Sequence, residues 1–265
     1  MTSQFTAAET FTASADRTFG VEIEFKSGLS QRDIADKLCE AGVDCEAERY
    51  NHQTSSHWKI ITDASVIGGW ELVSPPMSFD DSSFRQIEIV CQTLTALGAR
   101  IDKQCGLHVH HDARDLSDRQ IVKTVALYAK HEAYFDEMLP QSRRGANNGL
   151  LKSLNVRGDL KSTVKTITAC KTREELKAVY SDRYYKLNVH SLFRHGTLEF
   201  RHHSGTIEAT KIINWIKITR AMVERGANAK SVTVRNDTPN VDRFFRLTFG
   251  KELATYARTR RAQLN

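Results

Sequence analysis

Two glutamates at alternate positions near the start of the chain could hold a metal ion. The segment 18–26, TFGVEIEFK, alternates apolar and polar residues, so a strand there would project Glu22 and Glu24 from one face. Adjacent carboxylates repel one another unless a cation lies between them, and hard divalent ions prefer oxygen ligands. A solvated strand face shows the same pattern, so the pair alone does not specify a metal site.

A second cluster, 105–112 with the sequence CGLHVHHD, is rich in histidine. Alternation along a strand places His108, His110 and Asp112 on one face and turns His111 into the core. Imidazoles two residues apart suit metal ligation or phosphate contact. Each could equally be an ordinary, partly buried histidine.

A third cluster, 196–206 with the sequence GTLEFRHHSGT, repeats this arrangement. Thr197, Glu199, Arg201 and His203 are predicted to share one face of a strand. Glu199 could bind a metal ion while Arg201 holds an anionic group in its rigid fork. The alternative is a surface ion pair that contributes less than about 1 kcal/mol.

Two further segments add polar groups to this set. A fourth predicted strand places Lys186, Asn188 and His190 on one face, and a hairpin contributes Asp63 and Glu71. Glu71 follows a tryptophan and could instead be a residue at the rim. Because several strands each combine acids, histidines or arginine on one face with large apolar residues on the other, we predict that the combined cluster is a functional site.

The elements that must position these residues predict an α+β fold. Strands are expected at 18–26, 57–63, 70–74, 99–112, 183–191 and 197–203. Helices are expected at 30–42, 82–97, 117–139, from Thr172 onward and at 207–225, followed by a basic helical tail. The strands alternate apolar and polar residues and are often joined by short turns, so we predict a mostly antiparallel sheet.

The bulk properties of the 265 residues bound the class of protein. We expect a flexible segment, 1–16, without the features of a secretory signal, followed by one catalytic domain, 17–265. The five cysteines form no CxxC pair, which argues against disulfides and zinc–thiolate sites, and no apolar run predicts a membrane span. A cytoplasmic protein is therefore expected. The formal net charge of +6 suits an anionic partner such as a nucleotide, a nucleic acid or an acidic peptide.

Taken in order, GVEIEF, WELVSPP, CGLHVHH, SRR, YYKLNVHS and GTLEFRHHSGT resemble the amidoligase family. These are glutamine synthetase-like carboxylate–amine ligases, related also to gamma-glutamylcysteine ligases, and the resemblance spans about 19–215. It implies a curved, mostly antiparallel sheet with helices packed on its outer face. It also implies ATP at one end of a funnel and Mg²⁺, for which Mn²⁺ could substitute, between the nucleotide and the acid substrate.

The resemblance also implies roles for individual residues. By position, the metal ligands would be Glu22, Glu24, Glu71, His108 and Glu199. His110 resembles a group near the phosphates, and Arg201 is similar to an arginine that holds the substrate carboxylate or the transferring phosphate. Asn188 lies in the matching segment and would contribute to nucleotide binding.

One position departs from the synthetase pattern, because Thr197 stands where the first arginine of the motif is expected. Arg143 or Arg144 in the polar loop could supply the missing positive charge at the catalytic centre. Lys186 could supply it instead and would then contact the nucleotide.

The activity implied by the resemblance is ATP-dependent formation of an amide through an acyl phosphate. The partners would be a carboxylate substrate and an amine acceptor, either small molecules, peptides or proteins, and the basic surface leaves open an aminated nucleic acid. No membrane partner is expected, and no segment indicates an oligomeric state. Two alternatives share the cluster: a metal-dependent hydrolase that needs no ATP, and a non-catalytic nucleotide-binding member.

Overall fold

The computed structural model describes residues 17–51, 53–62, 66–145, 149–234 and 240–265. The predicted flexible segment, 1–16, and Asp63 lie outside these ranges.

A seven-stranded sheet organises the described part of the chain. Its strands are β1 (Phe19–Lys26), β2 (Cys45–Ala47), β3 (Trp58–Ile61), β4 (Gly69–Val73), β5 (Gly106–Asp112), β6 (Leu187–Asn188) and β7 (Thr197–Ser204). The order is β2-β3-β4-β1-β5-β7-β6, and every neighbouring pair is antiparallel except β2–β3. The prediction of an α+β fold with a mostly antiparallel sheet is confirmed.

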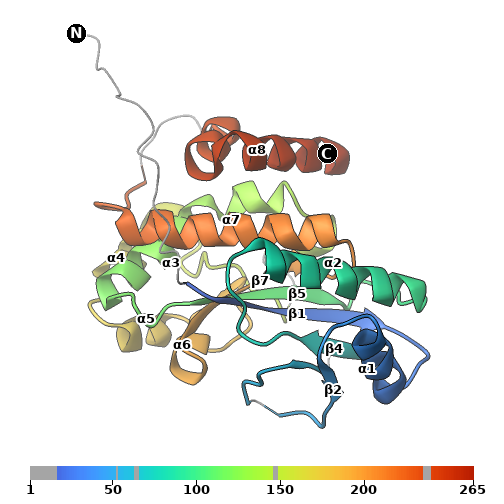
Figure 1. Ribbon diagram of the computed structural model, residues 1–265. Coiled ribbons are helices and arrows are strands. Elements are labelled where there is room, and N and C mark those ends of the chain that lie inside the picture. The colour runs from blue at the N-terminus through green and yellow to red at the C-terminus, as the bar shows by residue number, and fades with distance from the viewer. Residues whose placement is uncertain (1–16, 52, 63–65, 146–148, 235–239) are drawn as a thin grey trace.

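The helices of the described residues are α1 (Gln31–Glu40), α2 (Asp81–Ala96), α3 (Asp118–Asp136), α4 (Leu160–Ala169), α5 (Arg173–Val179), α6 (Ser191–Arg194), α7 (Ala209–Asn228) and α8 (Val241–Leu264). Helices α2, α3 and α7 lie along one face of this sheet, whereas the short α6 lies on the other side (Figure 1). A short 3₁₀ turn, η1 (Gln141–Arg143), follows α3. The helices α2, α3 and α7 lie next to the sheet, and α8 packs on α7 as an outer layer (Figure 1). Within the described residues, none of the helices combines the length and the apolar character that crossing a bilayer requires.

The alternation predicted for β1 separates the core from the opposite face. Phe19, Val21, Ile23 and Phe25 are almost completely buried in the main hydrophobic cluster. Their burial fixes the register of the strand, because a slip of one residue would turn all four side chains toward the other face. The polar residues of β1 are thereby held on the face away from this core.

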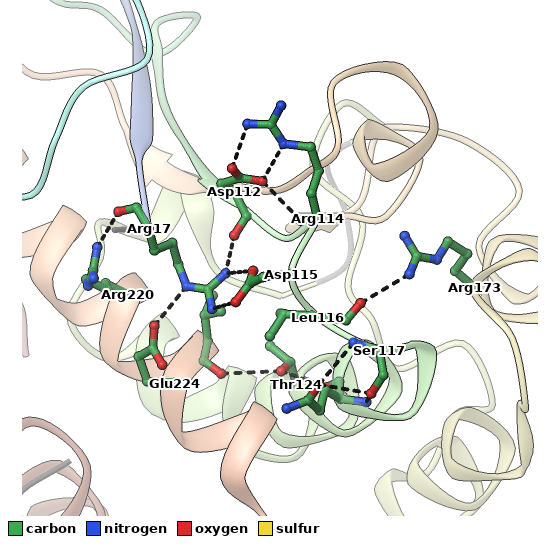
Figure 2. A network of polar contacts seen from close by, with 12 residues as sticks. Arg17, Asp112, Arg114, Asp115, Leu116, Ser117, Thr124, Arg173, Arg220 and Glu224 are labelled. Carbon is green, nitrogen blue, oxygen red and sulfur yellow. Dashed lines mark hydrogen bonds and ion pairs between the residues drawn. The ribbon is translucent and has the colours of Figure 1, made fainter. Parts of the chain in front are cut away.

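Arg17 anchors the start of β1 to the helical layer (Figure 2). Its guanidinium donates to Asp115 at 2.7 and 2.8 Å and to Glu224 of α7 at 2.8 Å. It also donates to the carbonyl of Asp112 at the end of β5, while Arg220 donates to the Arg17 carbonyl at 2.6 Å. These bonds join β1, β5 and α7 and hold the two central strands in place.

Two predicted strands are shorter in the structure. The strand expected at 99–112 begins only at Gly106, because Asp102 caps a turn by accepting from the amide of Gln104. The strand expected at 183–191 is reduced to β6, because the chain turns into α6 after Asn188 accepts from the amide of His190. Side-chain bonds of this kind compete with strand pairing and end it early.

The prediction that His203 shares a face with Glu199 and Arg201 is wrong. Val109 pairs with Phe200, but Leu107 pairs with His203, so β7 carries an extra residue in a bulge between these pairs. A bulge reverses the facing of the residues that follow it. His203 therefore lies on the helix side, with its ring 5.2 Å from that of Trp215.

Candidate active site

The sheet face opposite the helices forms the floor of a cavity of about 1330 Å³. Eight of the polar residues that line it come from five strands of the sheet. They are Glu22, Glu24, Glu71, His108, His110, Asn188, Glu199 and Arg201. The sequence patterns predicted this convergence, which follows from strand pairing of β4, β1, β5, β7 and β6 in that order.

Glu22 bridges the two histidines of β5. Its Oε2 lies 2.8 Å from His108 Nδ1, and its Oε1 lies 3.1 Å from His110 Nε2. His108 is the direct cross-strand partner of Glu22, and the imidazoles are two residues apart on the same face. His111 points into the core as predicted, where its Nε2 lies 2.8 Å from Thr219 Oγ1.

A second carboxylate pair lies beside His108. Glu24 and Glu71 are direct cross-strand partners, and both are about 95% buried, with 4% and 5% of their surface exposed. His108 Nε2 is 3.7 Å from Glu24 Oε1. The amide of Gly106 donates to Glu24 Oε2 at 2.5 Å, and a Cβ on that glycine would lie 2.9 Å from His108 Nε2. A glycine is therefore needed at the point where these two side chains meet.

The third part of the floor is contributed by β7 and β6. Glu199 accepts from Arg201 Nη1 at 2.5 Å and from Asn188 Nδ2 at 2.6 Å. Its Oε1 lies 3.9 Å from His108 Nδ1, so His108 lies within 4 Å of Glu22, Glu24 and Glu199. Both oxygens of Glu199 are thus oriented by partners on its own sheet.

Two sets of residues on the cavity floor could each hold a metal ion. In one set, ligand atoms of Glu22, His108 and Glu199 lie within 4.8 Å of one another. In the other, ligand atoms of Glu24, Glu71 and His108 do so. Carboxylate oxygens with one imidazole suit Mg²⁺ or Mn²⁺, and His108 is common to both sets.

Burial and nearby opposite charges shift the pKa values of the floor residues in opposite directions. Burial alone would raise the pKa of Glu22, but His110 and His108 hold it well below its ordinary value. Burial would likewise raise the pKa of Glu199, but Arg201 and His110 lower it. Burial lowers the pKa of His110, yet Glu22 and Glu199 together raise it above its usual value. The floor is therefore built to keep these carboxylates ionised.

The two arginines of the polar loop point to opposite sides. Arg143 lines the cavity, is 8% exposed, and donates from Nη2 to the carbonyl of Cys105. Arg144 lies outside the cavity lining and donates to the Leu139 carbonyl at 2.7 Å and to Asn265 Oδ1 at 2.6 Å. Of the two candidates, Arg143 is the one that the structure brings to the site.

The prediction that Lys186 shares the cavity face with Asn188 is wrong. Its ammonium is fully buried on the helix side, 2.9 Å from Glu132 Oε1 and 2.7 Å from Asp136 Oδ1 of α3. Because β6 spans only two residues, strict alternation does not extend back to Lys186. This lysine therefore belongs to the core and not to the cavity.

Two residues at the cavity were missed by the sequence patterns. Ser191 Oγ lies 2.7 Å from Thr197 Oγ1, which in turn lies 2.9 Å from His110 Nδ1. Lys59 of β3 lines the cavity, is 4% exposed, and donates to Asn51 Oδ1 at 2.8 Å. A lysine inside the otherwise apolar run WKII was the signal available for Lys59.

Comparison with known proteins identifies the family. A family model described as "putative amidoligase enzyme" matches residues 15–223, which include all the floor residues named above. No curated protein matches the chain. The family description indicates a ligase that forms an amide bond, and such an enzyme acts on a carboxylate and an amine. Because the match covers well over half of the 265 residues, the chain belongs to the amidoligase family.

Proposed function

We propose that this amidoligase is an ATP-dependent carboxylate–amine ligase that uses an acyl phosphate intermediate. The observation that carries the proposal is the pair of donor sets that share His108 on the cavity floor. Two donor sets that overlap at His108, beside buried arginines, suit a nucleoside triphosphate and an acid that must be brought together.

The donor chemistry supports Mg²⁺, with Mn²⁺ as a substitute. Four carboxylates, Glu22, Glu24, Glu71 and Glu199, lie on the floor, and three of them are at least nine-tenths buried. Buried like charges at this density are costly without a compensating cation. When bound, Mg²⁺ would neutralise phosphate oxygens of ATP and so favour attack at the γ-phosphorus.

Arg201 and Arg143 supply fixed positive charge to an anionic substrate group. Arg201 donates a hydrogen bond from Nη1 to Glu199, and its buried Nε has no hydrogen-bond partner within the described residues. Arg143 is almost fully buried with one guanidinium bond to a carbonyl. Donors that are desolvated and already oriented stabilise developing charge on a phosphoryl group or a carboxylate without reorganisation.

The floor also positions an imidazole and an amide. His110 is held between Glu22 and Thr197, and Asn188 is held against Glu199. In the proposed role, His110 contacts the phosphates and Asn188 orients Glu199. Thr197 in place of an arginine then has a physical function here, since its hydroxyl fixes the ring of His110.

In the proposed reaction, a carboxylate oxygen of the acid attacks the γ-phosphorus of ATP and ADP leaves. The amine nitrogen then attacks the acyl carbon, phosphate leaves, and the nitrogen loses a proton to give the amide. Arg201 and Arg143 hold the transferring group in line between the acid and ADP.

The test is a screen of acid and amine pairs in the presence of Mg²⁺ and ATP, in which ADP release is measured. The proposal predicts ADP release that requires both partners, and transfer of ¹⁸O from a labelled acid into phosphate. Amide or ester hydrolysis that proceeds without ATP would support the metal-dependent hydrolase instead. Binding of Mg²⁺ and ATP without ADP release for any acid and amine pair would favour a non-catalytic nucleotide-binding member.

A further inference from the structure

The C-terminal helix α8 lies outside the matched family region, which ends at residue 223. It packs on α7 as the outermost layer of the molecule (Figure 1). The rings of Phe244 and His131 stack at a centroid distance of 3.9 Å, and Phe245 and Phe249 are buried. This helix is therefore an integral part of the packed structure, although it contributes no residue to the cavity lining.

The end of α8 is bonded to the segment that carries Arg143. Arg144 donates from Nη1 to Asn265 Oδ1 at 2.6 Å and from Nη2 to the Leu264 carbonyl at 3.3 Å. Asn265 Nδ2 in turn donates to the Glu137 carbonyl at 3.0 Å, and Arg261 forms an ion pair with Glu137. Glu137 before this turn and Arg144 at its end are thus both bonded to the C-terminal end of α8.

The same segment is folded tightly around Arg143. Arg144 Nε donates to the Leu139 carbonyl at 2.7 Å, which closes the turn across Arg143. The amide of Arg143 donates to the Pro140 carbonyl at 2.9 Å, and the amide of Gly145 donates to Asp136 Oδ2 at 3.3 Å. Since adjacent residues in this turn face opposite sides, fixing Arg144 on α8 fixes the direction in which Arg143 leaves the backbone.

We propose that Arg144 and Asn265 are positioning residues that connect α8 to the active site by holding Arg143 in the cavity. Arg143 reaches the Cys105 carbonyl next to Gly106, whose amide binds Glu24. A continuous set of contacts therefore runs from Asn265, the residue that follows α8, to a carboxylate of the cavity floor. The importance of the Arg143 charge rests on the proposed function, whereas its placement by α8 can be tested separately.

Hydrogen exchange of peptides covering 139–145 tests the placement without any activity. Arg144→Gln and Asn265→Ala should speed exchange of these amides about tenfold, because their bonds to the turn are lost. Asn265→Asp keeps an acceptor for Arg144 but loses the donor to the Glu137 carbonyl, so its exchange should lie between that of Asn265→Ala and that of the parent protein. Arg258→Ala, an exposed change on the same helix, is the matched control and should leave the exchange unchanged.

Calorimetric binding of Mg²⁺ with β,γ-imido-ATP tests the consequence. Arg143→Gln should weaken binding about tenfold or more, and Arg144→Gln and Asn265→Ala about three- to tenfold, with the affinity of Asn265→Asp between those of Asn265→Ala and the parent protein. Unchanged exchange of 139–145 in a folded Arg144→Gln protein would overturn the proposal, as would unchanged binding despite faster exchange. If the parent protein binds no imido-ATP, the proposed function fails, and the exchange measurement alone decides the placement of Arg143.

Discussion

Glu24 and Glu71 face one another directly across the β1–β4 ladder, and both carboxylates are buried. Like charges at directly opposed positions destabilise a sheet, and burial increases the cost. Ligand atoms of both residues lie within 4.8 Å of each other and of His108. The arrangement is unfavourable without a cation and favourable with one, so it couples metal binding to the stability of the fold.

Replacing Glu71 with Gln should therefore separate stability from metal binding. Without metal, Glu71→Gln is expected to be as stable as the parent protein or more stable, because the like-charge contact is gone. Saturating Mg²⁺ should add about 3 kcal/mol to the parent protein at 100 times its Kd, and markedly less to the variant. Thermal unfolding with and without Mg²⁺ measures both effects.

The control for this prediction is Glu40→Gln, an exposed carboxylate with 63% of its side chain accessible that belongs to none of the candidate metal sets. Its Mg²⁺-induced increase in Tm should equal that of the parent protein. An undiminished increase in Glu71→Gln would show that Glu71 is no ligand.

The glycine at position 106 gives a steric prediction about the same site. A Cβ in Gly106→Ala would come within 2.9 Å of His108 Nε2 and 3.4 Å of Glu24 Oε2, so the His108 ring must move away from its position beside Glu24. Affinity for Mn²⁺, measured by titration, is expected to fall about tenfold or more, as for other losses of ligand orientation. Gly20→Ala is the matched control, because its Cβ would meet nothing closer than 3.7 Å. Equal Mn²⁺ affinity in the two variants would contradict the assigned geometry.

Lys186 gives a prediction about stability. It is fully buried between Glu132 and Asp136, and Asp136 also lies 2.7 Å from His202 Nε2. Lys186→Met leaves these acids without their cation, so the free energy of unfolding in urea should fall by about 3–5 kcal/mol. The partly exposed pair of Lys152 with Asp182 is the comparison, and Lys152→Met should lower the free energy of unfolding much less. If Lys186→Met lowered the free energy of unfolding as little as Lys152→Met does, a structural role of Lys186 in the core would be refuted.

The pH dependence of stability should report on His131. Burial between helices lowers the pKa of His131 to about 4, although its Nδ1 donates to the Leu127 carbonyl at 2.9 Å. An unfolded histidine has a pKa of about 6.5, so between these values the unfolded chain binds a proton that the folded protein does not. The free energy of unfolding therefore falls as the pH drops from about 6.5 to about 4, by about 2–3 kcal/mol from this residue.

His131→Phe removes the proton site and keeps a ring against Phe244. Its stability should decline less steeply over that range than the stability of the parent protein, as measured by urea unfolding at several pH values. His203, whose pKa burial lowers to about 3, would account for part of the slope that remains. Identical slopes in both proteins would show that His131 is not buried as a neutral ring.

The sequence alone was sufficient to predict the residues of the floor where strands are long and one side is apolar. Alternation in β1 and β5 placed Glu22, Glu24 and His108 on one face, because the opposite faces are filled by residues such as Ile23 and Val109. Burial of one face is a strong constraint on register, so such predictions hold.

The same reasoning failed where the backbone departs from regular pairing. The bulge in β7 turned His203 to the helices, and the two-residue length of β6 left Lys186 free to face α3. The choice between Arg143 and Arg144 depended on α8, more than 100 residues away in the sequence. Such long-range contacts have no signature in local periodicity.

The most direct test of the metal centre is a crystal structure of the protein with Mn²⁺ and β,γ-imido-ATP, using the anomalous signal of manganese. We predict two anomalous peaks beside His108, one ligated by Glu22 and Glu199 and one by Glu24 and Glu71, with phosphate oxygens at both. Manganese bound elsewhere, or nucleotide bound without metal at these carboxylates, would contradict the proposed ligase mechanism.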